Sequence, residues 1–289
     1  MTFDTFIETA WNDHADRPQD VADRLAVSIH IVEKAEQIPP FARLTTHVFG
    51  EHLGQWEQGI AILESLRGGQ AFDDRPAVTE ALLRNVAVLR YARGDEDALA
   101  PLSLENRVSV LATASSAFAG QGQFKQAISA YAEAIRYAPP DLPAKSAAIR
   151  ALAIGGNNLA AALEGKQDRD RAETKGMIDA AEGGLKYWKL AGTWLEEERA
   201  EYRLTRSLLQ AGEWAAAVRS ARRCIAVCEG NNAPEFELFF GHAVLALALR
   251  AAADAEGFTA ARQRALQMYE RVAPDERAWC KAELAELDR

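Results

Sequence analysis

The chain has 289 residues, of which 48% are hydrophobic, and its formal net charge at pH 7 is −9. The acidic excess lies entirely in the N-terminal third, because residues 1–106 hold 18 acidic and 9 basic side chains, whereas residues 107–289 hold 24 of each. A nucleic-acid partner would need a cationic face, so this charge argues against nucleic acid binding.

No membrane segment or secretory leader is expected. The longest apolar stretch, 243–253, is interrupted by Arg250 and is too short to span a bilayer. Asp4, Glu8 and Asp13 break up the N-terminus before an apolar segment can form. We therefore expect a cytoplasmic protein without a membrane partner.

The three cysteines do not indicate a disulfide framework. Cys224 and Cys228 lie one helical turn apart, which is poor geometry for a disulfide, and Cys280 is distant. Cys224, Cys228 and His242 could be combined into a metal site, but two cysteines at that spacing rarely suffice. We expect no metal and no cofactor.

The N-terminal segment predicts two helices, from Phe3 to His14 and from Pro18 to about Ile38, where Pro39-Pro40 ends the second. A second pair begins with a helix from Phe41 to Leu53.

A glycine break at Gly54-Gln-Trp56 follows that helix, and Gly59 stands where the helices of the second pair are expected to cross. A third pair begins at Pro76 and turns at Gly94-Asp95. Its second helix must be short, because Pro101 interrupts it.

The clearest unit runs from Val108 to Pro140. Gly122-Gln-Phe124 repeats the break, and Ala127 and Ala134 supply small residues seven positions apart, with Tyr131 between them. Glycines and prolines fall between segments whose apolar residues recur with the period of an α-helix. The β-sheet content should therefore be near zero.

The remaining units follow the same plan. Gly212-Glu-Trp214 is a third copy of the break, with Ala217, Ala221 and Cys224 at the small-residue positions. The fifth unit begins near Pro143, and its second helix is expected over 170–190. The helices expected after it cover 194–210, 234–255, 258–272 and 276–287.

The Val108–Pro140 spacing resembles the tetratricopeptide repeat (TPR), in which two antiparallel helices cross at small residues before a terminal proline. The family's usual Trp is Leu111 here, and its Leu-Gly pair is Ala114-Ser115. Residues 154–163, with the sequence IGGNNLAAAL, resemble the Leu-Asn-Asn-Leu-Ala phrase of kinesin-light-chain-like repeats.

This resemblance implies an all-α, right-handed superhelical array of antiparallel helix pairs. We expect one domain over 1–289, with about seven pairs and a C-terminal capping helix. The expected units are 1–40, 41–70, 71–106, 107–141, 142–192, 193–232 and 233–273, with the cap at 274–289.

Catalytic motifs are not evident. The sequence contains no His-Glu-x-x-His, Cys-x-x-Cys or Gly-x-Ser-x-Gly, and its five histidines are scattered over several predicted helices. His47 and His52 are five residues apart and share a helical face poorly. Residues 196–198, Glu-Glu-Glu, are interpreted as a solvated or helix-start charge run. We expect a protein that is not an enzyme.

Two asparagines suggest a binding surface. Aligned on the turn glycines, Asn85 and Asn158 fall at the same position. Peptide-binding TPR domains often grip the ligand backbone with a concave Asn, so the resemblance implies this role for Asn158 and Asn85. A solvent-exposed Asn, or one bonded to its neighbouring turn, is the alternative.

The same alignment of the units on their turn glycines predicts that further side chains point to the concave side. Arginines gathered there would favour carboxylates. The fourth unit lacks the Lys-and-Asn clamp for a C-terminal carboxylate, which argues against a chaperone tail. The additional predicted groove residues are Arg84, Arg150, Asn157, Tyr202, Arg203, Arg206 and Arg250.

We therefore expect a non-enzymatic scaffold that binds a peptide or protein segment in its groove. A regulatory sensor for a small peptide or anionic ligand, and an architectural subunit of an enzyme complex, are the alternatives. The aromatic set Tyr187, Trp188, Trp194 and Tyr202 is interpreted as core between repeats, with a ligand pocket as the second possibility. The oligomeric state is left open.

Overall fold

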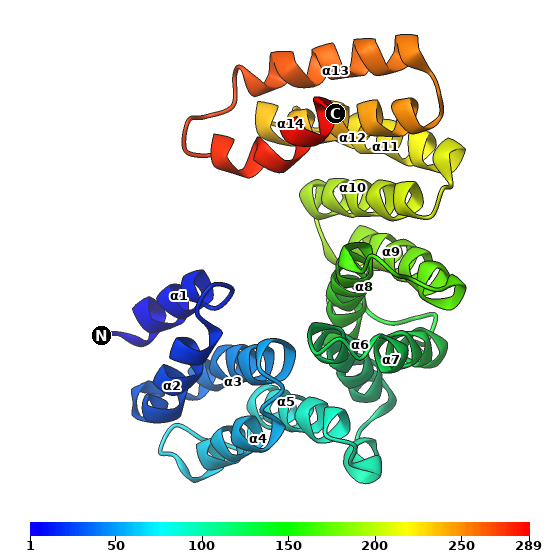
Figure 1. Ribbon diagram of the computed structural model, residues 1–289. Helices are drawn as coiled ribbons and strands as arrows, with labels where there is room; N and C mark the ends of the chain where they lie inside the picture. Colours follow the sequence, from blue (N-terminus) through cyan, green and yellow to red (C-terminus); the bar gives the residue numbers. More distant parts are fainter. The chain divides into compact units, whose positions relative to one another are not determined.

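The computed structural model describes all residues from 1 to 289 apart from the side chain of Glu96, and the described backbone forms helices and no strands (Figure 1). The prediction of an all-α chain is confirmed. The α-helices are α1 (Phe3–Asp13), α2 (Pro18–Val27), α3 (Ile38–Thr46), α4 (Trp56–Ser65), α5 (Pro76–Ala92), α6 (Leu104–Gly120), α7 (Phe124–Tyr137), α8 (Ala147–Gly165), α9 (Arg171–Ala191), α10 (Trp194–Gln210), α11 (Trp214–Gly230), α12 (Glu235–Ala251), α13 (Ala255–Tyr269) and α14 (Lys281–Leu287).

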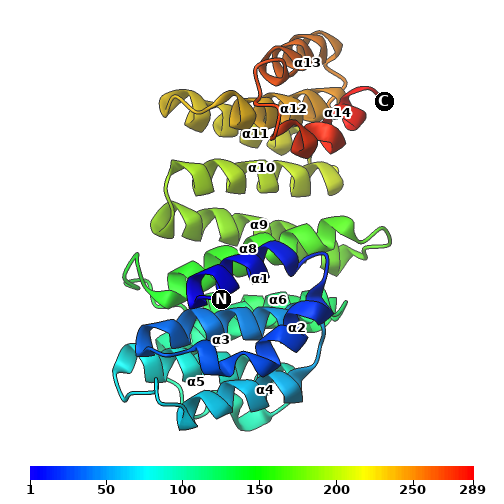
Figure 2. The same ribbon diagram turned by 90° about the vertical axis from the view of Figure 1, so that its left-hand side faces the viewer.

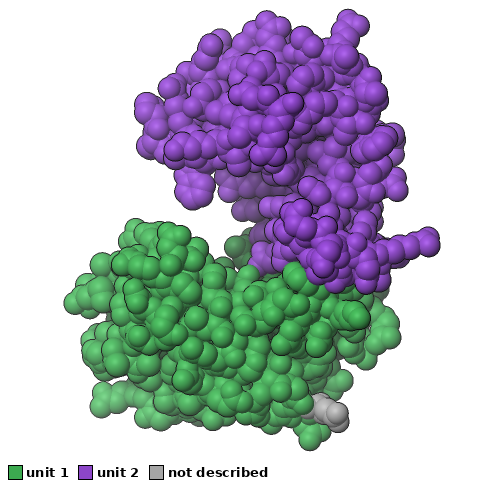
Figure 3. Space-filling model, in the orientation of Figure 1, with its two compact units in different colours: residues 1–155 green, residues 156–289 purple. Residues whose placement is uncertain are grey.

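The chain divides into two compact units, Met1–Gly155 and Gly156–Arg289 (Figure 3). The division falls within α8. Consecutive helices pack against one another in each unit: α3 through α6 each contact the next helix in unit 1, and α9 through α12 each contact the next helix in unit 2. Figure 2 shows α9, α10 and α12 running side by side in unit 2. This packing of successive helices is the repeat arrangement that the sequence predicts.

The three predicted glycine breaks are tight turns with left-handed backbone. The φ angles of Gly54, Gly122 and Gly212 are 63°, 70° and 78°, a region that only glycine enters without steric cost. Each glycine stands two residues before the aromatic residue that begins the next helix, α4, α7 or α11. The breaks therefore set the antiparallel reversal within each pair.

Small residues lie at the helix crossings, as predicted. Ala127 and Ala134 have no exposed surface, and a Cβ atom at Gly59 would come within 2.6 Å of the Leu89 side chain. Between the two alanines, the Tyr131 hydroxyl donates a hydrogen bond of 2.9 Å to the carbonyl of Leu152 on α8. The close crossings let α7 contact the next pair with a buried tyrosine.

The helix predicted from Pro18 to Ile38 is wrong. α2 ends at Val27, and two 3₁₀ turns, η1 (Ile29–Ile31) and η2 (Ala35–Gln37), lead into α3. Pro39 and Pro40 lie in the first turn of α3 and do not end a helix. The first four N–H groups of a helix have no partner within it, so prolines are tolerated there.

The continuous helix predicted from Phe41 to Leu53 is also different in the structure. After α3 the chain forms a π-helix, η3 (His47–His52), whose hydrogen bonds span five residues. The N–H of Leu53, for example, donates to the carbonyl of Val48 at 3.1 Å. η3 packs against α2, α3 and α6.

The short second helix predicted for the third unit is confirmed as the 3₁₀ turn η5 (Glu96–Leu99). The last predicted helix, 276–287, begins as another 3₁₀ turn, η6 (Arg277–Cys280), and continues as α14, which packs against α12. Over the described residues, no helix combines the length and the apolar character needed to cross a lipid bilayer.

Candidate ligand-binding cavity

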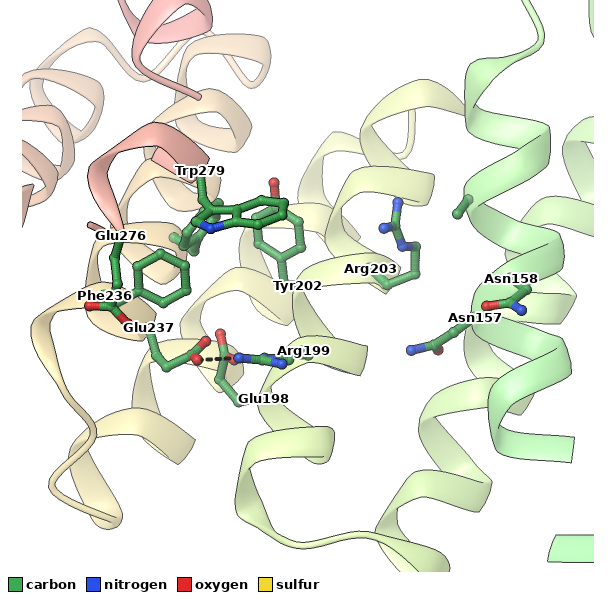
Figure 4. Close-up of a pocket in the computed structure, with 12 residues that line it drawn as sticks. Asn157, Asn158, Glu198, Arg199, Tyr202, Arg203, Phe236, Glu237, Glu276 and Trp279 are labelled. Carbon is green, nitrogen blue, oxygen red and sulfur yellow. Dashed lines mark hydrogen bonds and ion pairs between the residues drawn. The ribbon is translucent and has the colours of Figure 1, made fainter. Parts of the chain in front are cut away.

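Unit 2 contains a cavity of about 710 Å³ that is lined by the first helices of successive pairs (Figure 4). This volume is typical of sites that hold a small molecule or a few side chains of a peptide. The walls come from α8, α10, α12 and the segment that includes η6. The lining residues are Asn157, Asn158, Ala161, Glu198, Arg199, Tyr202, Arg203, Phe236, Glu237, Phe240, Glu276 and Trp279.

Aromatic side chains form one part of the wall. Phe236 and Phe240 lie one turn apart on α12 with ring centres 5.0 Å apart, and Tyr202 of α10 packs edge-on against Phe240 at 5.8 Å. Trp279 of η6 also lines the cavity, yet 74% of its surface is exposed. An indole this exposed beside an apolar wall provides a surface on which a ligand can stack.

Two amides form the opposite part. Asn157 and Asn158 extend from α8, as Figure 4 shows. The Oδ1 atom of Asn157 is buried and has no hydrogen-bond partner among the described residues. It lies against Gly184 of α9, where a Cβ atom would come within 2.5 Å of it. The glycine thus allows α9 to approach α8 and to fix the Asn157 side chain.

The arginines of the cavity are already paired. Arg199 contacts Glu237 at 2.6 Å, and Arg203 forms a salt bridge with Glu164 of α8. Glu164 also accepts a 2.6 Å hydrogen bond from Ser207. Because each guanidinium has a carboxylate partner, the cavity does not offer an unpaired cationic wall.

Glu198 is the most unusual residue of the wall, since only 1% of its surface is exposed. The Cys224 thiol donates to its Oε1 atom at 3.1 Å, while Oε2 has no partner among the described residues. Burial raises the pKa of Glu198 to about 8, and the nearby Glu237 carboxylate adds to this effect. Glu198 is therefore mostly protonated at pH 7.

The interpretation of 196–198 as a solvated or helix-start charge run holds for Glu196 and Glu197, which lie in the first turn of α10 and are partly exposed, and is wrong for Glu198. Glu196 caps α10, with Oε2 accepting a hydrogen bond of 2.7 Å from the N–H of Thr193. Glu198 is two residues further and lies on the opposite face of the helix, where it is buried.

Three of the predicted groove residues hold α14 in place. Arg206 forms two hydrogen bonds with the Glu286 carboxylate, at 2.7 and 2.9 Å, and Arg250 donates to the Glu286 carbonyl at 3.0 Å. The Tyr202 hydroxyl donates to Glu283 at 2.7 Å. Burial raises the pKa of Tyr202 well above its usual value, so the hydroxyl stays protonated.

The other predicted groove residues belong to unit 1. Arg84 donates to Asn106 at 2.9 Å, and the Asn85 amide donates to the carbonyl of Ala81 on its own helix at 2.8 Å. Arg150 is exposed near the start of α8. The structure thus brings Asn157, Asn158, Tyr202 and Arg203 together around one cavity.

Sequence reasoning missed the aromatic wall and Glu198. Phe236 and Phe240 carried a usable signal, because two aromatics four residues apart on a first helix must share a face. Trp279 carried none, since it lies in the segment that was expected only to seal the end of the array.

Comparisons with known proteins identify the fold. Neither protein-family models nor characterised proteins give a match by sequence. Among solved structures, the chain is similar to a candidate kinesin light chain from Podosopora anserina with nearly identical TPR-like repeats. The TM-score is 0.50 at 12% identity, covering 81% of this chain and 93% of that one. The chain therefore has a TPR-like helical-repeat fold.

Proposed function

We propose that the chain is a non-enzymatic scaffold whose unit 2 binds a peptide or protein segment. The observation that carries this proposal is the cavity in which an aromatic wall faces the side-chain amides of α8. Phe236, Phe240 and Trp279 would receive an apolar side chain of the ligand. Asn158 would hold the ligand backbone, because an amide offers a donor and an acceptor to a peptide bond.

The charges of the cavity favour an apolar anchor over an acidic one. Arg199 and Arg203 already pair with Glu237 and Glu164, and a carboxylate ligand would have to compete with these partners. Glu198 adds a neutral acid at pH 7. Net electrostatic attraction for an anion is therefore small, and burial of aromatic surface is left as the main source of affinity.

A binding role fits the chemistry of the wall better than catalysis does. The Cys224 thiol, which contacts the wall residue Glu198, is fully buried, and its hydrogen bond with Cys228 and its burial raise its pKa. A buried thiol with a raised pKa is a poor nucleophile. Groove binding is also the use to which curved helical repeats are suited, because they present a long concave surface.

The proposal can be tested with peptides selected from a random display library against the purified full chain. Synthetic copies of the selected peptides are then titrated by isothermal calorimetry. Trp279→Ala should weaken binding at least tenfold, because truncating an aromatic anchor typically costs about 2 kcal/mol or more. Trp214→Ala is the matched control, since Trp214 is 51% exposed and lies outside the cavity wall.

Asn158→Ala tests the backbone contact separately. It should weaken every selected peptide by a similar factor, whatever its sequence, because the amide reads the peptide backbone. Equal affinities for the wild type and Trp279→Ala, or an equal loss in Trp214→Ala, would refute the assignment of this cavity. Selection of acidic peptides without an apolar anchor would favour the anionic-ligand alternative.

A further inference from the structure

Three histidines of unit 1 meet beside the π-helix. The rings of His14, His47 and His52 have centres 4.9, 5.1 and 4.7 Å apart, and one nitrogen of each lies within 4.8 Å of the others. Each side chain is partly buried, so solvent can still reach the group. Within the part of the chain that the structure describes, no other cluster of three His, Cys, Asp or Glu side chains has this geometry.

The π-helix is the reason that His47 and His52 come together. In an α-helix, residues five apart point about 140° away from each other. Hydrogen bonds in η3 instead close over five residues, which places each side chain near the one five positions on. The Nε2 atoms of His47 and His52 are 3.1 Å apart. The sequence expectation that these two share a face poorly is therefore wrong.

Hydrogen bonds fix the tautomers of two of the rings. His47 Nδ1 lies 3.0 Å from Glu51 Oε2, and His14 Nδ1 lies 2.5 Å from the Trp11 carbonyl oxygen. A carboxylate and a carbonyl only accept, so each Nδ1 carries the proton and each Nε2 presents a lone pair. Metal-bound histidines usually have this arrangement, in which the second nitrogen donates to a carboxylate or carbonyl.

The spacing of the nitrogens suits a transition-metal ion. Two histidine nitrogens on a tetrahedral zinc ion, with Zn–N bonds of about 2.0–2.1 Å, lie roughly 3.3 Å apart. His47 and His52 already approach this separation. His14 lies within 4.8 Å, so a modest rotation of its ring would complete the set.

We propose that His14, His47 and His52 bind one divalent transition-metal ion of the zinc type through their Nε2 atoms. Since His47 Nε2 has a lone pair, His52 Nε2 donates to it in the metal-free chain, and on metal binding this proton moves to His52 Nδ1 or to solvent. Glu51 and the Trp11 carbonyl orient two of the rings, and the fourth position of the ion is left to water. Imidazole ligands select zinc, copper, nickel and cobalt over magnesium and calcium, which prefer oxygen.

Binding has a structural consequence, because the ligands come from two elements. His14 follows α1 directly, whereas the other two belong to η3. An ion shared among them would link the N-terminal helix to the π-helix. The same link predicts a higher thermal midpoint in the presence of the ion, since ligand that binds only the folded state stabilises it.

The test uses the full chain without a polyhistidine tag, freed of metal with a chelator. Cobalt(II) is titrated and followed by its visible absorption, and zinc is then added as a competitor. We expect a one-to-one complex with the intense absorption of tetrahedral cobalt, which zinc displaces and magnesium does not. Absence of one-to-one cobalt or zinc binding to the wild type would overturn the proposal.

Substitutions locate the ion. His52→Ala and His14→Gln should each abolish the tetrahedral spectrum, and Glu51→Gln should weaken binding by about 10- to 100-fold. His30→Ala is the matched control, because His30 lies in the same unit, is exposed, and hydrogen-bonds to the Val27 carbonyl outside the three-histidine cluster. Far-UV circular dichroism without metal identifies any variant that fails to fold. If one of the two histidine variants is unfolded, the metal affinity of the other one tests the site. Unchanged affinity in a folded ligand variant, or an equal loss in His30→Ala, would refute the site.

Discussion

Replacing Glu198 by Gln should make the protein more stable at neutral and alkaline pH. The carboxyl is buried beside Glu237, Arg199 and Cys224, and it has a pKa of about 8 in place of an ordinary value of 4.5. Between these two values the folded chain holds a proton that the unfolded chain has released. The free energy of unfolding must therefore fall as the pH rises from 4.5 to about 8.

The expected size follows from the two pKa values. Each pH unit in this window costs about 1.4 kcal/mol, so wild type loses roughly 3 kcal/mol between pH 4.5 and pH 7. Gln carries no charge at any of these pH values, and its carbonyl can still accept the hydrogen bond of the Cys224 thiol. The variant should match wild type near pH 4.5 and exceed its stability by a few kcal/mol at pH 8.

Urea unfolding at pH 5, 6, 7 and 8, followed by far-UV circular dichroism, measures this difference. Glu197→Gln is the control, because this neighbour is 32% exposed and lies 3.4 Å from Lys189. It should leave the pH dependence of the midpoint nearly unchanged. The reasoning fails if Glu198→Gln and wild type lose stability in parallel as the pH rises.

Further substitutions test the packing. Gly120→Ala should destabilise unit 1 by about 1–3 kcal/mol in urea unfolding, because a Cβ there overlaps the Glu51 carbonyl oxygen; unchanged stability would refute this close approach. Tyr131→Phe should cost about 0.5–1.5 kcal/mol through its lost hydrogen bond to α8, again measured by urea unfolding. Arg206→Gln removes the paired contact with Glu286 and should speed amide hydrogen exchange in α14; equal exchange rates would show that other contacts hold this helix.

Local chemistry explains which parts of the fold the sequence predicted. The turns at Gly54, Gly122 and Gly212 were recognisable because a left-handed residue is nearly always glycine, and the aromatic residue after each turn marks the start of a helix. α10 occupies the residues predicted for it, 194–210; in the structure Thr193 caps its N-terminus, and the turn at Gly212 follows its end.

Proline shows why a boundary can be misread. Pro39-Pro40 is compatible with the end of one helix or with the first turn of the next, and the two cases have the same local sequence. Tertiary packing decides between them. Ile38 and Phe41 are fully buried in the core of unit 1, and a helix that begins at Ile38 places both on one face because they are three residues apart.

The histidine cluster shows a deeper limit of periodicity. Predicting which residues share a helical face assumes a fixed rotation of about 100° per residue. One π-helical turn changes the direction in which every later side chain of the helix points. The residues from His47 to His52 contain no local signal that predicts a π-helical turn. The π-helix packs against the C-terminal end of α6, where Gly120 allows close approach to Glu51 and Gln121 donates to the Glu51 carbonyl at 2.9 Å. These partners lie about 70 positions away in the chain, so a local pattern cannot contain the information that aligns His47 with His52.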